Sequence, residues 1–129
     1  MKVERFEQLE IWQLARELSK NVKTYSTDNT FERDFRFRDQ IRSAAGSIMD
    51  NIAEGFERGG NKEFLQFLYI AKGSCGEVRS QNHRALDFGY ISQEQHEHLN
   101  NQAIQLNVKI NNLIQYLKKS DLKGEKYHK

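Results

Sequence analysis

Residues 40–58 read QIRSAAGSIMDNIAEGFER, and this stretch carries the clearest helical pattern in the chain. Its apolar residues recur at steps of three and four and are Ile41, Ala44, Ala45, Ile48, Ile52 and Phe56. That spacing gathers side chains on one side of an α-helix. Because several residues of the stretch are small, other backbones can approach it closely. We therefore predict a central helix that other helices cover on more than one side.

A second, polar series follows the same rhythm beside the apolar one. Its members are Gln40, Ser43, Ser47, Asn51 and Glu54. With Arg42, and with Glu77 and Gln81 of the next helical segment, these side chains can satisfy one another as a buried or interfacial network. We predict that this strip fixes helix register and holds copies of the protein together. Glu54 and Glu77 could instead form an acid–base pair, but the network is the favoured interpretation.

Composition limits the protein to one helical domain. The chain has 129 residues and no proline, the residue that most often interrupts helices. Charged residues make up 29% of it and the mean hydropathy is -0.84, which fits long solvent-facing helices. The single cysteine, Cys75, lies on an apolar stripe and has no partner for an internal disulfide. Because we find neither a signal segment nor an apolar run of membrane length, we expect a cytoplasmic protein with no membrane partner.

The helical period recurs on both sides of the central stretch. It predicts four helices, over about residues 8–26, 33–58, 61–88 and 92–119. Short connections between them imply an all-α fold, an antiparallel up-down-up-down four-helix bundle over residues 1–119. A flexible basic tail is expected over 120–129. Gly73 and Gly76, inside the third helix, predict a close helix crossing, because each costs roughly 1 kcal/mol relative to alanine.

Residues with known capping chemistry mark the predicted connections. Gly59 and Gly60 suit a left-handed cap that ends the second helix, and Asn61 suits the N-cap of the third. Ser92 and Gln95 match a capping box at the start of the fourth helix. These signals support the predicted order of the helices.

Motifs for catalysis or cofactor binding are missing from the predicted helices. A di-iron site in such a bundle needs Glu-x-x-His pairs that project into the core, and the four helices contain no such pair. No glycine-rich loop follows a strand, which excludes phosphate binding of the nucleotide type. We expect no enzymatic activity, no catalytic residues, no metal or other cofactor, and no small-molecule substrate.

Positive charge gathers in two places, although the formal net charge is only +2. Four arginines lie near the start of the second predicted helix: Arg33, Arg36, Arg38 and Arg42. Three lysines lie at the end of the fourth helix and in the tail: Lys118, Lys119 and Lys123. We predict that these side chains contact nucleic-acid phosphates without reading base sequence. The alternative is that both groups are ordinary solvated faces.

Three further strings accompany the central stretch, which continues to residue 59 as QIRSAAGSIMDNIAEGFERG. They are FEQLEIWQLARELSKNV at 6–22, FLQFLYIAKGSCGEVRSQ at 64–81 and LDFGYIS at 86–92. The most specific pieces are QIR to NIAEG within 40–55 and IAKGS to Glu77 within 70–77. Together they resemble the four-helix-bundle family of 23S rRNA intervening-sequence proteins, over roughly residues 6–115. Members commonly carry proline where this chain has Glu32 and Met49, which leaves fine geometry open.

The resemblance implies a bundle that assembles into a ring-like homopentamer and binds RNA or other nucleic acid. A similar bundle is the accessory protein of diversity-generating retroelements, where it partners a reverse transcriptase. Our leading hypothesis is therefore a non-enzymatic, oligomeric nucleic-acid-binding bundle. The alternative is a protein-interaction scaffold or accessory subunit, for example a partner of a reverse transcriptase, that touches no nucleic acid. Subunit contacts are predicted at Phe6, Leu9, Trp12 and the surface around Gly46 and Asp50.

Overall fold

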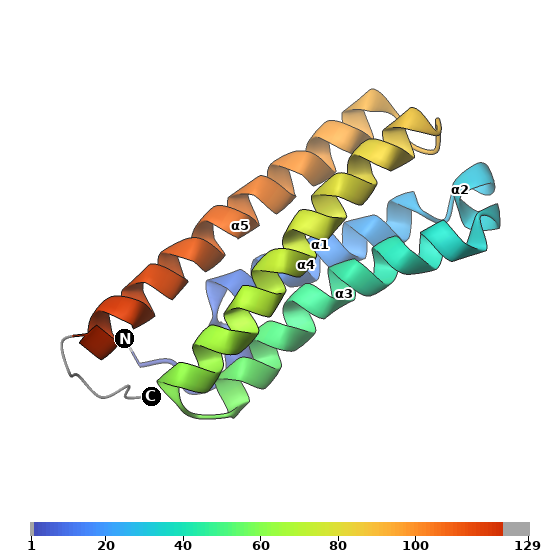
Figure 1. Cartoon of the computed structure of the whole chain (residues 1–129). Coiled ribbons are helices and arrows are strands. Elements are labelled where there is room, and N and C mark those ends of the chain that lie inside the picture. Colours follow the sequence, from blue (N-terminus) through green and yellow to red (C-terminus); the bar gives the residue numbers. More distant parts are fainter. Residues whose placement is uncertain (1, 123–129) are drawn as a thin grey trace.

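The computed structural model describes residues 2–122, and every regular element in that range is a helix (Figure 1). In chain order the elements are η1 (Phe6–Gln8), α1 (Glu10–Tyr25), α2 (Asn29–Arg33), α3 (Phe35–Glu57), α4 (Asn61–Asp87) and α5 (Gln93–Leu122). The four long helices are joined by short connections and run alternately up and down. Helix α3 packs between α1 and α4, and α5 closes the bundle against α4 and α1. The predicted all-α bundle is confirmed.

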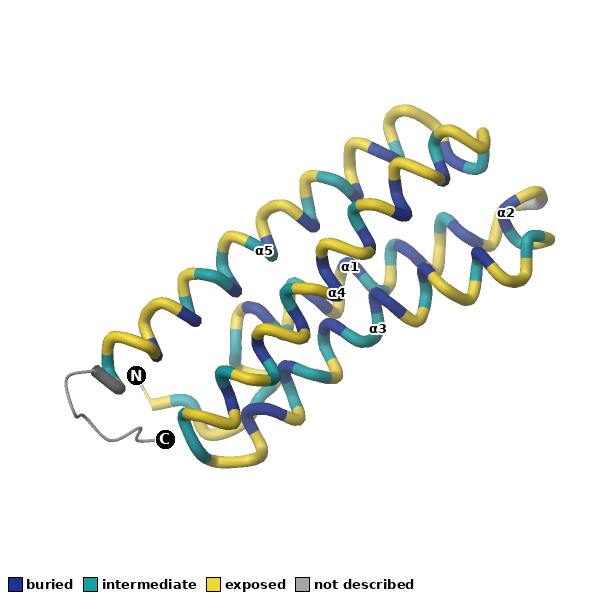
Figure 2. Tube along the Cα trace, viewed as in Figure 1, coloured by how far each residue is buried: buried dark blue, intermediate teal, exposed yellow. Residues whose placement is uncertain are grey.

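The core is the apolar stripe that the sequence pattern predicted. All six apolar residues of the central stretch are buried, and Ala45, Ile48 and Ile52 are fully enclosed. Figure 2 shows the buried residues of each helix turned toward the other helices, with exposed residues on the outside. Burial of these side chains is the main force that holds the four helices together.

The second predicted helix corresponds to α3, which begins at Phe35, and Asp34 separates it from the additional short helix α2. The Asp34 carboxylate caps α3 by accepting a hydrogen bond from the backbone N–H of Phe37 at 3.3 Å. Its other oxygen accepts a hydrogen bond from the Tyr90 hydroxyl at 2.7 Å, and this bond raises the pKa of Tyr90. Asp34 therefore ties the start of α3 to the turn between α4 and α5. Phe31, in α2, is buried against this end of the core.

The helix ends agree with most of the predicted caps. Gly59 has a φ of 83° and closes α3, as predicted. Ser92 and Gln95 form the predicted capping box, with reciprocal hydrogen bonds of 3.0 Å. Asn61 was expected to be an N-cap, but Gly60 takes that position. The Asn61 amide instead donates to the Leu117 carbonyl at 3.1 Å and thus joins α4 to α5.

The ends of two helices differ from the predicted ends. Helix α1 begins at Glu10 rather than near residue 8, because the short 3-10 helix η1 precedes it. Helix α5 continues to Leu122, beyond the predicted end at 119. The rest of the predicted tail, 123–129, lies outside the described residues.

The predicted close crossing at Gly73 and Gly76 is wrong. A Cβ atom added at either position would meet no atom within 4 Å, because both glycines point away from the bundle. The close approach occurs at Gly55 of α3, where an added Cβ would lie 2.6 Å from the Cβ of Phe67 on α4. Gly55 is therefore the position where two helix backbones need a residue without a side chain.

Candidate nucleic-acid interface

Two of the four predicted phosphate-binding arginines are used inside the protein. Glu32 of α2 accepts from Arg38 Nη1 at 2.7 Å and from Arg42 Nη2 at 3.2 Å. Arg42 also donates from Nε to the Ser26 hydroxyl at 2.8 Å and from Nη2 to the Ser26 carbonyl at 3.1 Å. Both arginines are half-buried. Because their donors join α1, α2 and α3, we do not carry these two arginines forward as phosphate contacts.

The Arg38 guanidinium is held by a second carboxylate. Its Nε donates to Asp39 Oδ1 at 3.0 Å, and this hydrogen bond is the largest cause that raises the pKa of Arg38. The side chain also lies over the Phe35 ring, 5.0 Å from its centre. Arg38 thus has three partners within the chain: Glu32, Asp39 and the Phe35 ring.

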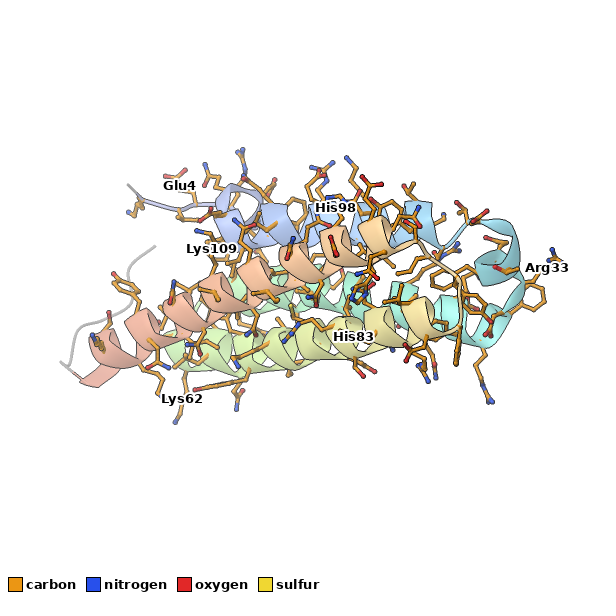
Figure 3. All side chains as sticks on the ribbon, turned by 90° about the horizontal axis from the view of Figure 1, so that it is seen from above. Glu4, Arg33, Lys62, His83, His98 and Lys109 are labelled. Carbon is orange, nitrogen blue, oxygen red and sulfur yellow. The ribbon has the colours of Figure 1, made fainter. Side chains whose placement is uncertain are left out.

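Arg33 and Arg36 are exposed at the same end of the bundle, where Figure 3 labels Arg33. Arg36 lines an open groove of about 730 Å³ between α3 and α4. The groove also contains Asp39, Gln40 and Glu77, so its charge is mixed. This end therefore offers phosphate a smaller positive patch than the sequence predicted.

Lys118 and Lys119 are exposed near the opposite end of the bundle, at the end of α5. Because an α-helix rises about 1.5 Å per residue, the stretch from the start of α5 to these lysines is roughly 40 Å long. Lys123 lies outside the described residues. The predicted phosphate-binding arginines and lysines that the structure describes therefore form two separate groups, one at each end of the bundle, and not one patch.

The predicted polar strip is only partly a network. Ser47 and Ser74 share a hydrogen bond of 3.0 Å between α3 and α4, and the Asn51 amide donates to the Ser47 hydroxyl at 2.9 Å. Glu54 pairs instead with Arg58 of its own helix at 2.8 Å. Gln40 and Ser43 face the open groove between the same two helices.

Glu77 and Gln81 have different surroundings on α4. Glu77 lines the groove beside Ala44, whereas Glu54 lies ten residues further along α3, which corresponds to about 15 Å. The two carboxylates are therefore too far apart for the acid–base pair that the sequence left open. Gln81 is buried, and its Oε1 has no hydrogen-bond partner within the described residues.

Cys75 is fully buried between α4 and α5, as predicted for a core residue. Its thiol donates to the Ala103 carbonyl, with the sulfur 3.2 Å from the oxygen. Burial raises the pKa of this thiol to about 11. The side chain therefore stays protonated near neutral pH and acts as a small apolar group.

Sequence reasoning missed one group of cations on α4. Lys62, Lys72 and Arg79 follow the helical period of His83, whose ring lies 4.8 Å from the His96 ring of α5. They therefore lie on the side of α4 that faces α5. The sequence does contain a signal for this group: Lys72 and Arg79 are seven residues apart, which places both on one face of a helix.

Within residues 2–122, no group of three His, Cys, Asp or Glu side chains is placed to hold a metal ion. None of the helices in this part of the chain combines the length and the apolar character needed to cross a bilayer. The exposed cations at the two ends of the bundle form the candidate site.

The fold and this exposed charged surface define a small antiparallel four-helix-bundle protein. The chain belongs to the family described as 23S rRNA-intervening sequence protein, whose family model matches residues 7–112. The predicted family resemblance is thus confirmed. No curated protein matches the chain.

A solved structure has the same fold. It is a protein with unknown function from the S23 ribosomal protein family of Bacteroides thetaiotaomicron, 21% identical in sequence with a TM-score of 0.74. The match covers 81% of this chain and 97% of that chain. At this identity the likeness establishes the fold and carries no residue roles.

Proposed function

We propose that this protein is a non-enzymatic, oligomeric helical bundle that binds RNA or other nucleic acid through the phosphate backbone. The observation that carries the proposal is the exposure of cations at both ends of the bundle, Arg33 and Arg36 at one end and Lys118 and Lys119 at the other. Exposed lysine and arginine side chains bind phosphates without reading base sequence. The family's description by an intervening sequence of 23S rRNA supports the same class of partner.

Assembly explains how a protomer with a formal charge of only +2 can bind a polyanion. Each protomer offers few exposed cations at each end, and each single phosphate contact is weak. A ring of protomers repeats these contacts, so that they act together on one nucleic-acid molecule. We propose the homopentamer that the family resemblance implies.

Nucleic-acid binding is tested by electrophoretic mobility of a structured RNA and a duplex DNA at two salt concentrations. If four cations per protomer each neutralise one phosphate, affinity for duplex falls roughly a hundredfold between about 50 and 200 mM salt. Retarded bands at low salt that disappear at the higher salt are the expected result. Absence of retardation at low salt with micromolar protein would refute nucleic-acid binding and favour the protein-interaction scaffold.

Assembly is tested by light scattering of the purified protein at micromolar concentration. Phe6, Leu9 and Trp12 pack partly against the protomer's own core, and the surface around Gly46 and Asp50 is the other predicted subunit contact. Gly46→Arg should dissociate the oligomer without unfolding it, because a Cβ at this position meets no atom within 4 Å.

Gln105→Arg, an equal change of charge on the exposed side of α5, is the control and should leave the mass unchanged. A wild-type protein that scatters as a monomer would exclude the ring.

A further inference from the structure

The edge of α4 that faces α5 carries its cations in a line. Its residues recur at steps of three and four and are Lys62, Leu65, Tyr69, Lys72, Gly76, Arg79 and His83. At about 1.5 Å per residue, Lys62, Lys72 and Arg79 span roughly 25 Å along the bundle. Glu63 and Glu77, which interrupt this stretch of sequence, lie at other positions around the helix, and Glu77 lines the groove on the α3 side.

Helix α5 offers an unusual partner for this edge. From residue 98 to residue 120 it contains no aspartate or glutamate, although the chain has 18 of them. The stretch holds three lysines and many side-chain amides, and the amides are Asn100, Asn101, Gln102, Gln105, Asn107, Asn111, Asn112 and Gln115. A long helical surface without carboxylates is free of the charge that most strongly repels phosphate.

Three hydrogen bonds establish how the two helices align. Asn61 bonds to the carbonyl of Leu117, Cys75 to that of Ala103, and Asn82 to that of His96. In this antiparallel register, Lys62 lies beside the end of α5 that carries Lys118. Lys72 lies level with residue 106 and Arg79 with residue 99. The cations of α4 thus run alongside the amide-rich, carboxylate-free part of α5.

An exposed aromatic side chain lies along the same seam. Tyr69 is 48% exposed and lies between Lys62 and Lys72 on this edge of α4. Gly73 and Gly76 leave open space above the backbone of α4. An exposed aromatic ring between cations is the arrangement on which an unpaired base can stack while its phosphates are neutralised.

We propose that this seam between α4 and α5 is a track for a single-stranded segment of nucleic acid. Lys62, Lys72, Arg79 and Lys118 contact phosphates spaced along one strand, and Tyr69 stacks on a base. Asn100, Asn107 and Asn111 of α5, which follow the helical period of His96 and Ala103, donate to sugars and base edges. A single strand fits better than a duplex because the cations form one line and because a paired base offers no free face for stacking. This inference rests on the proposed function and names a surface and a form of nucleic acid for it.

The test measures fluorescence anisotropy of a labelled single-stranded RNA, and of the duplex made from it, with full-length protein. Lys72→Glu/Arg79→Glu should weaken single-strand binding at least tenfold. The matched control, Lys20→Glu/Lys23→Glu, reverses two exposed cations of α1 that lie outside both proposed surfaces. It changes the net charge equally and should weaken single-strand binding less than threefold. Tyr69→Ala should weaken single-strand binding about fivefold or more, without changing the salt dependence, because stacking is not ionic.

Because Lys72 and Arg79 are half-buried, a second variant separates binding from folding. Lys62→Glu/Lys118→Glu affects exposed residues only, and should also weaken binding at least tenfold while the thermal unfolding curve is unchanged. If wild-type protein binds RNA and both seam variants bind as tightly, the track is wrong and the proposed function stands. Duplex binding as tight as single-strand binding, or displacement of the strand by an equal charge of polyglutamate, also overturns the track. Failure of wild-type protein to bind either form overturns both proposals.

Discussion

Gly55→Ala is expected to destabilise the protein by about 3 kcal/mol, the upper part of the range for overpacking a core. An added Cβ would lie 2.6 Å from the Cβ of Phe67 and 3.1 Å from Cδ1 of Phe64. The first of these atoms is attached directly to the backbone of α4, so it cannot turn away as the end of a long side chain would. The two helices must separate locally, and the surrounding core contacts weaken.

The matched control is Gly73→Ala, the same substitution in the interior of a neighbouring helix. Gly73 has no positive φ, and a Cβ there would meet no atom within 4 Å. It should therefore stabilise the protein by about 0.5–1 kcal/mol through helix propensity and a less flexible unfolded chain. Urea unfolding followed by circular dichroism measures the free energy of unfolding of both variants. Equal effects of the same sign at the two positions would show that the crossing at Gly55 is not as close as the structure has it.

Arg42→Ala should destabilise the protein by about 2–3 kcal/mol, since it removes three hydrogen bonds of one guanidinium. Ser26, at the end of α1, is fully buried, and its carbonyl would lose the Arg42 donor. Glu32 would keep only its contact with Arg38. The penalty arises from a buried carbonyl and a carboxylate left with fewer partners, in addition to the lost contacts themselves.

Arg36→Ala provides the comparison, because Arg36 is an exposed residue of the same helix. It should change the free energy of unfolding by less than about 0.5 kcal/mol. The loss of unfolding free energy caused by Arg42→Lys should lie between those of Arg36→Ala and Arg42→Ala. An ammonium group cannot reproduce the planar guanidinium that reaches Ser26 and Glu32 together. Chemical unfolding distinguishes the three variants. An Arg42→Ala protein as stable as Arg36→Ala would mean that Arg42 is solvated, and would restore it as a phosphate-contact candidate.

The helices and the core could be predicted because their signals are local. Side chains three and four residues apart lie on the same face of a helix whatever surrounds it, so the apolar period identified Ile48 and Ile52 as core residues. Capping is local as well, and the Ser92 and Gln95 box was predicted from a spacing of three residues. The short helix α2 was not predicted, and neither was the hydrogen bond between Asp34 and Tyr90, because these two residues are distant in the sequence.

The candidate interface was predicted less well, because sequence shows that a cation exists but not what it faces. Arg38 and Arg42 appeared equivalent to Arg36, and only the folding of α2 onto α3 brings Glu32 between them. The glycines show the same limit, since Gly55 and Gly73 both lie within helices and differ only in what another helix places beside them.

The order of residues was thus enough to specify four antiparallel helices, their apolar faces and most of their ends, because helical periodicity and capping act within a few residues. Pairing between helix edges depends on register across the bundle, which packing of distant segments sets. That packing placed Glu32 between Arg38 and Arg42, separated Glu54 from Glu77, and aligned Lys72 and Arg79 beside the carboxylate-free part of α5.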